Sequence, residues 1–516
     1  MKPSLFVTAE KVEGLRSVDE VRAFVETDVG QSIWNPMLEY LHGFMASPPF
    51  TPKTPLEGRD PKFIDMEEND HTLSFATGQR VLCDALVHLV TGETRYRDDA
   101  VAQLLCTLDE EVWPEWRHGV NAQKGIGVDH RVGNFILQFS IAYDWLHAFL
   151  SPDERQRIVE GLDRRGIQPA FASMEKDGFW VTYSNWSGTI VTGLGLFGMA
   201  VGDEHPRSQE LIDYAVPWMG RYMDVIGPEG ESNESAAYAG AMIQPVLFYN
   251  ACRYHSRGEH DAFGQTRLDA FGHWYAYHSL PPGQMVEFGD GGKGSAPNVT
   301  MFCALADLMD DGVLQWFYYQ YRDCRGHLYY PMVLLSINPH IEPVSPEGRW
   351  PRGRAFPGYS QNAISRSSWD PKAPACVVCG KASHGFEDRK EAGEGGWYHL
   401  DLDAGQITID GYGERLIVDL GSSGGYGPWG LYRGDNYGKG TFGHNVLMIG
   451  GRNTLELGAS HPRMVASDFD DEKGGWWKAD LTGTYEGAKG IRRTVVHLNP
   501  GIVAVLDEAE LEQAEE

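Results

Sequence analysis

The spacing of apolar residues changes once along this chain, and that change is the strongest constraint on its fold. From Val21 to about Ile337, apolar residues recur at helical spacing, in segments of roughly 12 to 20 residues broken by Gly, Pro and Asp. After Pro343 the pattern alternates with a period of two, in short runs separated by Gly, Asn and Asp. We therefore expect a helical region followed by antiparallel β-structure.

The helical region contains one explicit helix start, the segment SPDE at 151–154, which places a capping serine before Pro at N1 and Glu at N3. Roughly ten to twelve helices fit into the region. Short connections make successive helices antiparallel neighbours. No repeat of fixed period is visible, which favours a closed (α/α) toroid over a solenoid.

The 516 residues exceed what one hydrophobic core usually organises, so we expect two domains. Residues 1–340 are predicted to form an (α/α) toroid and residues 363–516 an antiparallel β-sandwich. The connection 341–362 contains four prolines and is predicted to be a linker or crossover. The strand pattern is still running at the C-terminal end, so we expect further strands in the natural protein.

The formal net charge of −28 argues against a nucleic-acid partner, because binding to phosphate chains requires a basic surface. An acidic substrate would also need local positive charge at its site. No apolar run of about 18 residues is present, so no membrane span is expected. The N-terminal segment lacks a secretory pattern, which predicts a cytoplasmic protein, or a periplasmic or secreted one if a leader was removed.

Two segments of the helical region carry polar groups suited to chemistry. Asn185 stands where a polar segment enters an apolar, Gly-rich helix, although Asn is also a favoured N-cap residue. Tyr238 follows a turn, and Glu234 lies four residues before it, so the two would share one face of a helix. A tyrosine in this position is also compatible with a core role.

Three ionisable residues alternate in a predicted strand, His399, Asp401 and Asp403, which would place them on one face. Such a row is costly in a core. Asp419 and His444 are candidates for the same cluster, because carboxylates and an imidazole together suit a divalent metal. The alternative is that these side chains are hydrogen-bonded turn and strand-end residues.

Together these segments resemble the heparinase II/III-like polysaccharide lyases, which include oligoalginate lyases and are related to dermatan sulfate epimerase. The resemblance covers nearly the whole chain. Each motif is weak alone, but their order and spacing are fairly specific. The segments that carry the resemblance are FSIAYDWLHAFLSPDER, NWSGTIVTGLGL, GPEGESNESAAYAG, HLDLDAGQITIDGYGERLIVDLG and GHNVLMIGGRN.

The resemblance implies a toroid and sandwich that cleave a uronate-containing acidic glycan by β-elimination. It implies that Asn185 neutralises the substrate carboxylate and that Tyr238 transfers a proton next to the cleaved bond. His399 would be the partner acid or base. Trp186 stands where several relatives have a histidine, so one candidate base is absent.

The substrate-binding residues are predicted to be Trp186, Glu234 and Arg433, the last as a guanidinium that pairs with carboxylate, although a surface arginine is an equal alternative. With one base fewer, we expect glucuronate or mannuronate, in which the C5 proton and the C4 oxygen lie on one face. The resemblance does not identify the glycan.

The resemblance also implies a mainly structural metal, usually zinc, with ligands at Asp401, Asp419 and His444. Asp401 replaces the usual histidine. Because the site is then richer in oxygen, manganese, calcium or no metal at all are alternatives to zinc.

Three other functions stay open at this point. A uronate C5-epimerase would use the same proton abstraction. A glycoside hydrolase on an α/α toroid would draw two acids from Glu231, Glu234 and Asp290. A noncatalytic glycan-binding protein would not need Tyr238 or His399.

Overall fold

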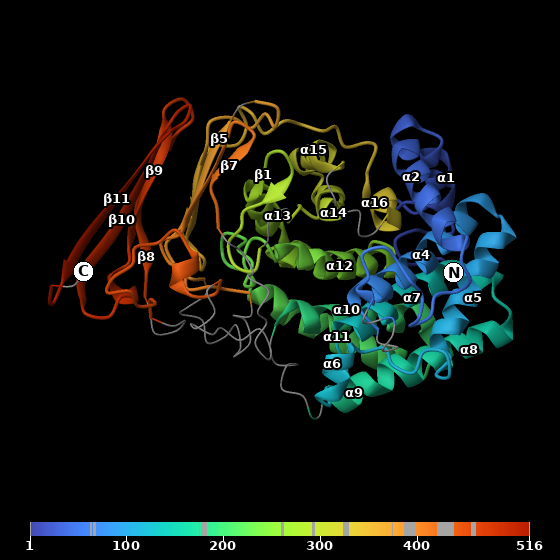
Figure 1. The fold of residues 1–516 in the computed structure, drawn as a ribbon. Coiled ribbons are helices and arrows are strands. Elements are labelled where there is room, and N and C mark those ends of the chain that lie inside the picture. The colour runs from blue at the N-terminus through green and yellow to red at the C-terminus, as the bar shows by residue number, and fades with distance from the viewer. Residues whose placement is uncertain are drawn as a thin grey trace. The chain divides into compact units, whose positions relative to one another are not determined.

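The computed structural model describes two compact units (Figure 1). The described residues are 2–514 except 62–63, 65–68, 175, 177–182, 260–262, 292–294, 324–329, 374, 386–398, 420–437 and 456–460. Unit 1 comprises Met1–Tyr222, Met242–Thr266 and His327–Asn338. Unit 2 comprises Met223–Ala241, Arg267–Gly326 and Pro339–Glu516. A single division near residue 340 therefore does not describe the units, because two earlier segments pack with the sheets.

Unit 1 is built from helices. Their bounds are α1 Val18–Val25, α2 Asp28–Met45, α4 His71–Thr91, α5 Thr94–Leu108, α6 Gly119–Gln123, α7 His130–Leu146, α8 Pro152–Leu162, the π-helix η2 Asp163–Ile167, α9 Gln168–Met174, α10 Asn185–Val201, α11 Ser208–Asp224, whose last two residues fall in unit 2, α12 Ile243–His255 and α16 Tyr330–Ser336. The predicted start of α8 is confirmed, since Glu154 N–H donates to Ser151 Oγ and the Glu154 carboxylate accepts the Ser151 N–H.

More α-helices are described than the ten to twelve expected, fifteen between residues 18 and 336. One reason is that the apolar residues between Val18 and Met45 form two helices and not one. Helix α1 ends at Val25, and Thr27 then caps α2 by accepting the Gly30 N–H at 3.0 Å. Helical periodicity continues across such a break, so the periodicity alone does not reveal where one helix ends and the next begins.

Helices α4, α7 and α10 lie side by side and run parallel in unit 1. The His71 and His130 ring centroids at the first residues of α4 and α7 are 6.0 Å apart, and the His130 and Trp186 rings are 5.1 Å apart. Farther along α4 and α7, Gln79 donates to Gln138 at 3.2 Å. The N-terminal ends of the three helices therefore meet at one end of unit 1.

Small residues bring α10 close to its neighbours. A Cβ on Gly133 of α7 would lie 2.8 Å from Ile190 Cα, and one on Gly195 would lie 2.5 Å from Phe248 of α12. Thr192 Oγ1 also donates to a carbonyl of α12, that of Gln244, at 3.4 Å. Because larger side chains would separate the helices, the Gly-rich composition of α10 is explained by packing, and α12 continues the parallel set.

The described part of unit 2 carries three α-helices and two main antiparallel sheets. The helices are α13 Leu268–Tyr277, α14 Val299–Met309 and α15 Gly312–Tyr321. A five-stranded sheet has the order β3-β4-β5-β6-β7 and a four-stranded sheet the order β11-β10-β9-β8. The strands are β3 Gly353–Phe356, β4 Asn362–Arg366, β5 Cys376–Lys381, β6 Ile407–Gly411, β7 Glu414–Ile417, β8 Arg463–Asp470, β9 Gly474–Asp480, β10 Ala488–Leu498 and β11 Ile502–Leu511, and a small hairpin pairs β1 Ser279–Leu280 with β2 Gln284–Met285.

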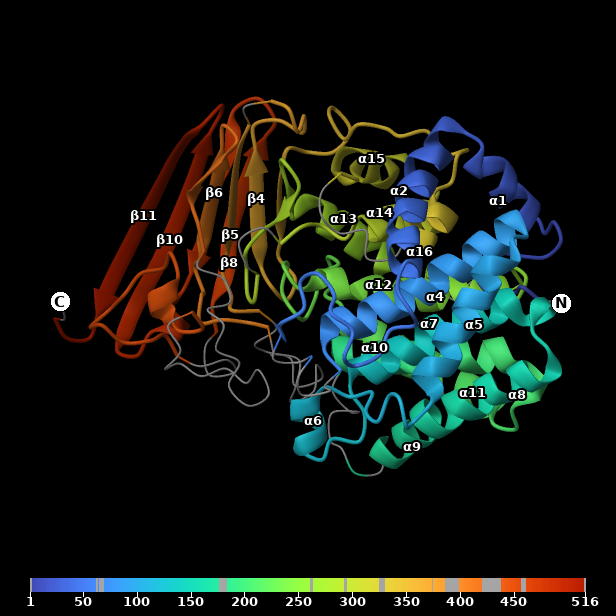
Figure 2. The ribbon, with the colours of Figure 1, turned by 45° about the vertical axis from the view of Figure 1, so that its right-hand side comes forward.

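The two main sheets share a hydrophobic core. Val378 and Ile407 of the five-stranded sheet cluster with Trp477 and Val495 of the four-stranded sheet. Figures 1 and 2 show the two sheets as successive layers. A Cβ on Gly380 would lie 2.6 Å from the Trp477 ring, so glycine makes room for this indole between the layers.

One predicted strand is a loop, and part of the predicted linker is a strand. His399–Asp403 is irregular, as are most of residues 444–450, whereas β3 lies within the segment expected to be a linker. The backbone of these loops bonds outside a sheet ladder: Leu402 N–H donates to the Lys439 carbonyl, and Asn445 N–H to the side chain of Gln406. Alternation of polar and apolar residues did not distinguish these loops from strands.

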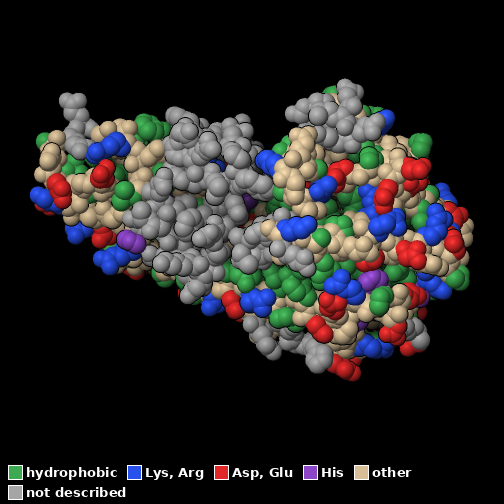
Figure 3. Space-filling model, turned by 90° about the horizontal axis from the view of Figure 1, so that it is seen from below, with side chains coloured by type: hydrophobic (Ala, Val, Ile, Leu, Met, Phe, Trp, Pro, Cys, Tyr) green, Lys and Arg blue, Asp and Glu red, His purple; other side chains and the backbone are tan. Residues whose placement is uncertain are grey.

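Charges are mixed on the face shown in Figure 3, where Asp and Glu lie among Lys and Arg over the helices. The acidic excess of the chain is therefore not gathered into one patch on that face. Within the part of the chain that the structure describes, none of the helices combines the length and apolarity needed to cross a membrane.

Candidate active site

The rings of Tyr238 and His399 stack on each other in unit 2. Their centroids are 3.4 Å apart and their planes differ by 10°. Two residues that the sequence places far apart are thereby brought into contact, as the predicted roles require.

The segment before Tyr238 is a series of turns, so the helical face predicted for Glu234 and Tyr238 is wrong. Ser235 between them has a φ of 78°, a left-handed conformation that interrupts a helix. The side chain of Glu234 is buried, with 2% of the residue exposed, which does not support direct contact with a substrate.

A glycine-rich loop lies against both partners of the stack. Gly289 has a φ of 76°, and a Cβ there would collide with the His399 carbonyl oxygen. A Cβ on Gly291 would lie 2.5 Å from that of Ala237, next to Tyr238. Between these glycines, Asp290 N–H donates to the His399 carbonyl at 3.1 Å. Glycine is required at both positions because the loop fits between the two segments.

The carboxylate of Asp290 holds the imidazole of His399. His399 Nδ1 and Asp290 Oδ2 are 2.7 Å apart, and Lys439 forms ion pairs with Asp290 and, at 2.9 Å, with Asp401. Burial raises the pKa of Asp290, but the bond to His399 and the Lys439 charge outweigh it, so the net pKa is lowered. The pKa of Lys439 is raised, because its two carboxylate partners outweigh burial.

The ionised state of Asp290 bears on the hydrolase alternative. A carboxylate whose pKa is lowered and whose oxygens already bind two groups is poorly suited to act as a general acid. Glu231, another acid of that alternative, is fully buried. Among the three candidate acids of the hydrolase mechanism, the described geometry therefore offers no pair that is open to a glycosidic oxygen.

A group of potential metal ligands lies beside this pair, formed by Asp401, Asp403 and His444. One ligand atom from each lies within 4.8 Å of the others. Asp419, predicted as a ligand, instead accepts a hydrogen bond from His444 Nδ1 at 2.8 Å and another from Gln406. Asp403 thus stands where Asp419 was expected, and Asp419 orients the imidazole, a common arrangement around metals.

The donor atoms of this group are buried and only partly compensated. Asp403 Oδ1 lies 2.7 Å from Lys381 Nζ. Burial raises the pKa of Asp401, with Lys439 opposing it. His444 Nε2 and the Oδ2 atoms of both aspartates have no hydrogen-bond partner among the described residues. Two carboxylates and one imidazole nitrogen are a donor set that a divalent cation fits.

Asn185 and Trp186 belong to unit 1, at the N-terminal end of α10. The N-cap is Ser184, whose N–H donates to Ser187 Oγ at 3.2 Å, so capping does not account for Asn185. Asn185 is the first residue of the helix and is partly exposed. The remaining predicted substrate contact, Arg433, lies outside the described residues.

His130 contacts Trp186 and was not predicted. Its Nδ1 has no hydrogen-bond partner among the described residues, and burial together with Arg131 lowers its pKa well below the usual value. A neutral imidazole from α7 therefore lies next to Trp186. In the sequence His130 is marked only by the capping Asp129 before it.

Lys439, Asp403 and the pairing of Asp290 with His399 were also not predicted. Asp290 and Lys439 sit in the glycine-rich segments GDGGKG and YGKGTFG, which indicate loops but not their partners. Asp403 was noted in the sequence as a neighbour of Asp401 but was not chosen as a ligand. Nothing local distinguishes Asp403 from Asp419.

The fold is that of heparinase-type lyases, which confirms the predicted resemblance at the level of the fold. A heparan sulfate lyase from Pedobacter heparinus is 14% identical with a TM-score of 0.55, over 95% of this chain and 77% of that one. A heparinase III gene product is 13% identical with a TM-score of 0.55, over 98% and 80%. A further heparinase III structure is 14% identical with a TM-score of 0.53, over 96% and 77%. No family model matches the sequence, and no curated protein matches it.

Proposed function

We propose that this protein is a polysaccharide lyase that cleaves a uronate-containing acidic glycan by β-elimination. The observation that carries the proposal is the stack of Tyr238 on His399, with His399 held by Asp290. The likeness to heparan sulfate lyase supports the class of reaction. We further propose that the parallel helices α4, α7, α10 and α12 belong to the inner layer of an (α/α) toroid and that the two sheets form its β-sandwich partner.

His399 is oriented for proton exchange through one nitrogen. Since Nδ1 donates to the ionised Asp290, a proton is gained or lost at Nε2. An imidazolium stacked on the phenol would also stabilise negative charge on the Tyr238 oxygen.

Tyr238 would carry the proton between substrate atoms. As phenolate it takes the C5 proton, the C5 electron pair forms the C4–C5 double bond, and the C4–O bond breaks. The phenol then returns the proton to the leaving C4 oxygen. A single residue serves both steps when the two groups lie on one face, as in glucuronate and mannuronate, so we propose these as the cleaved units.

Neutralising the uronate carboxylate stabilises the carbanion-like state at C5. We propose Asn185 for this role, with Trp186 and Arg433 as further substrate contacts. These roles rest on the resemblance to the lyases. They are tested by measuring kcat for a variant of Asn185. Asn185→Ala should lower kcat by about 100-fold or more, the effect of removing one donor from a developing charge.

We also propose a divalent metal, zinc, manganese or calcium, held by Asp401, Asp403 and His444. When bound it would supply structural rigidity, joining the loop after His399 to the segment that carries His444. Elemental analysis of the purified protein should find one metal per chain. Asp403→Asn should abolish metal binding. Asp419→Asn should lower the affinity for the metal by about 10- to 100-fold, the effect of removing a residue that only orients a ligand.

The test of the lyase is ultraviolet absorbance from the C4–C5 double bond on a panel of uronate polysaccharides. Tyr238→Phe should abolish the signal with an unchanged circular dichroism spectrum. Tyr319→Phe, on α15, is the matched control and should retain activity. New reducing ends without absorbance would show hydrolysis instead. Exchange of the C5 proton for deuterium without cleavage would show an epimerase.

A further inference from the structure

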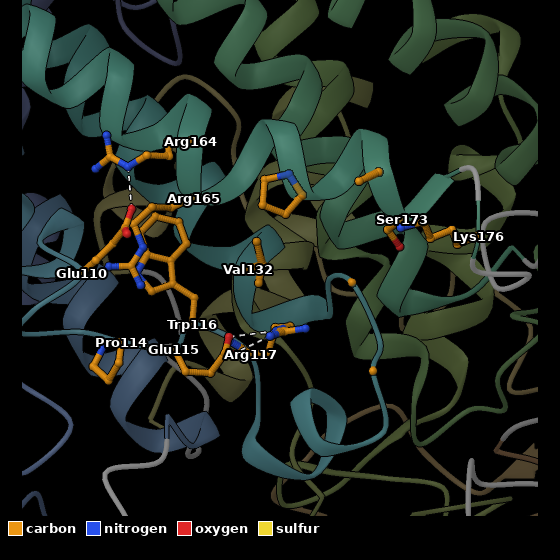
Figure 4. Close-up of a pocket in the computed structure, with 14 residues that line it drawn as sticks. Glu110, Pro114, Glu115, Trp116, Arg117, Val132, Arg164, Arg165, Ser173 and Lys176 are labelled. Carbon is orange, nitrogen blue, oxygen red and sulfur yellow. Dashed lines mark hydrogen bonds and ion pairs between the residues drawn. The ribbon is translucent and has the colours of Figure 1, made fainter.

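A pocket of about 430 Å³ opens on unit 1 (Figure 4). It lies between α9, the π-helix η2 and the segment 110–127, and its volume is in the range of small-molecule sites. Its lining carries four cationic side chains and two carboxylates, a local excess of positive charge in a chain of net charge −28. The charged residues are Glu110, Glu115, Arg117, Arg164, Arg165 and Lys176.

Arg165 is the partly buried cation of this pocket that forms no ion pair with a described carboxylate. Its guanidinium donates to the carbonyls of Thr107, at 3.1 Å, and Trp113, and lies 4.7 Å from the Trp116 ring centroid. Among the residues that the structure describes, no acidic group forms an ion pair with it. Burial lowers its pKa to about 10. The charges of Glu110 and Glu115 favour its protonated form from a distance, but burial outweighs them, so an anion bound directly to the guanidinium would stabilise it.

The neighbouring arginines differ from Arg165 in being paired. Arg164 Nε lies 2.5 Å from Glu110 Oε1, and Arg117 binds both oxygens of Glu115, at 2.9 and 2.6 Å. Figure 4 shows both pairs as dashed lines, with Arg165 beside Trp116. The two carboxylates would repel a dense anion such as phosphate, but they can accept hydrogen bonds from hydroxyl groups.

The turn that presents these arginines is unusual. Residues 163–167 form a π-helical turn, a rare element that is frequent at functional sites. A Cβ on Gly166 within it would lie 2.6 Å from Ile136 Cγ1, so glycine lets the turn pack on α7, and Arg164 and Arg165 precede this contact on the same turn. The turn therefore has a packing basis that keeps Arg165 in place.

We propose that this pocket binds a sugar acid, with the carboxylate at Arg165 and the hydroxyl groups at Glu110 and Glu115. The site would be an accessory site for a uronate unit, carried entirely by unit 1. It uses none of the residues assigned to elimination, so its failure and that of the lyase proposal are distinguishable. The bidentate geometry of guanidinium suits a carboxylate.

The first experiment is isothermal titration calorimetry with methyl glucuronoside, using matched variants at Ala172. This residue lines the pocket from α9 and is exposed, so substitution should not disturb the fold. Ala172→Glu adds a negative charge and should weaken binding by about tenfold or more. Ala172→Gln, which has the same shape without the charge, should bind within about threefold of the wild type.

Arg165→Gln should abolish glucuronoside binding. A thermal unfolding curve shows whether that variant folds. Methyl glucoside, the neutral analogue, should not bind. Binding of inorganic sulfate but not of the glucuronoside would overturn the sugar assignment. Glucuronoside binding that is unchanged in Ala172→Glu would overturn the site. Elimination is measured separately by absorbance. If Ala172→Glu loses glucuronoside binding while turnover that depends on Tyr238 stays intact, the pocket has an accessory role.

Discussion

Asp290 of unit 2 and Arg165 of unit 1 are both charged groups at least partly withdrawn from water, but only Asp290 forms direct ion pairs with described residues. Asp290 binds His399 and Lys439, which come from other segments of the chain. Arg165 binds two carbonyl groups and an indole. The difference suggests two kinds of site. A paired network fixes atoms for proton transfer, whereas a cation without a direct ion pair can still bind an anionic ligand.

The largest effect is expected from Asp290→Asn, which tests whether the paired network orients His399. Without an ionised acceptor at Nδ1, the imidazole loses its preferred tautomer, and kcat should fall about 10,000-fold, as in other His–Asp pairs. The measurement is the absorbance assay, with circular dichroism to check the fold. Asp311→Asn is the matched control, because Asp311 binds His273 at 2.9 Å outside the site. Equal losses in both variants would refute the role of Asp290.

Next is Lys439→Met, which removes the cation between two buried carboxylates. Lys439 is 8% exposed. Leaving Asp290 and Asp401 without it should lower the free energy of unfolding by about 4 kcal/mol. Urea denaturation at neutral pH gives this value. Lys473→Met removes an exposed lysine 3.7 Å from Asp470 and should leave stability unchanged. A similar midpoint for both variants would show that burial does not strengthen the network.

A third prediction concerns Glu231, a buried carboxyl without an ion-pair partner among the described residues. Burial raises its pKa from 4.5 to about 7. The unfolded chain therefore ionises first, and stability is lost as pH rises between these values. Glu231→Gln removes this loss. Its free energy of unfolding should exceed that of the wild type by about 3 kcal/mol at pH 8, with little difference at pH 4.

The measurement for Glu231 is the free energy of unfolding across that pH range. Glu414→Gln changes an exposed residue of the same unit and serves as the control. A Glu231→Gln curve parallel to that of the wild type would show that the carboxyl is solvated in the folded state.

The smallest effect is expected from Arg164→Gln. Arg164 pairs with Glu110 at the surface of the pocket, and both side chains are more than half exposed. Exposed pairs contribute little, so the unfolding midpoint should stay unchanged. A large loss of glucuronoside affinity in this variant, with Arg165 intact, would move the anion site from Arg165 to Arg164.

Local features of the molecule could be predicted from its sequence because they depend on neighbouring residues. The SPDE segment specifies the start of α8 through bonds that span three positions. The alternating runs that became β9 and β10 carry their own pattern of burial. The resemblance also named Tyr238 and His399 together, and the structure stacks them.

The errors occurred where distant segments decide the conformation. His399–Asp403 alternates like a strand, but its backbone bonds to the loop of Lys439. Glu234 and Tyr238 have helical spacing, but Ser235 turns the chain between them. Periodicity reports burial along a segment and not the partners of its backbone groups.

By itself, the sequence determined the helical and sheet regions, the caps and the residue types available for acid, base and metal chemistry. Only the tertiary structure decided that Asp290 holds His399, that Asp419 orients His444, and that Arg165 forms no ion pair with a described carboxylate. The physical reason is that charge pairing and burial depend on distances between segments, which a periodic pattern does not contain.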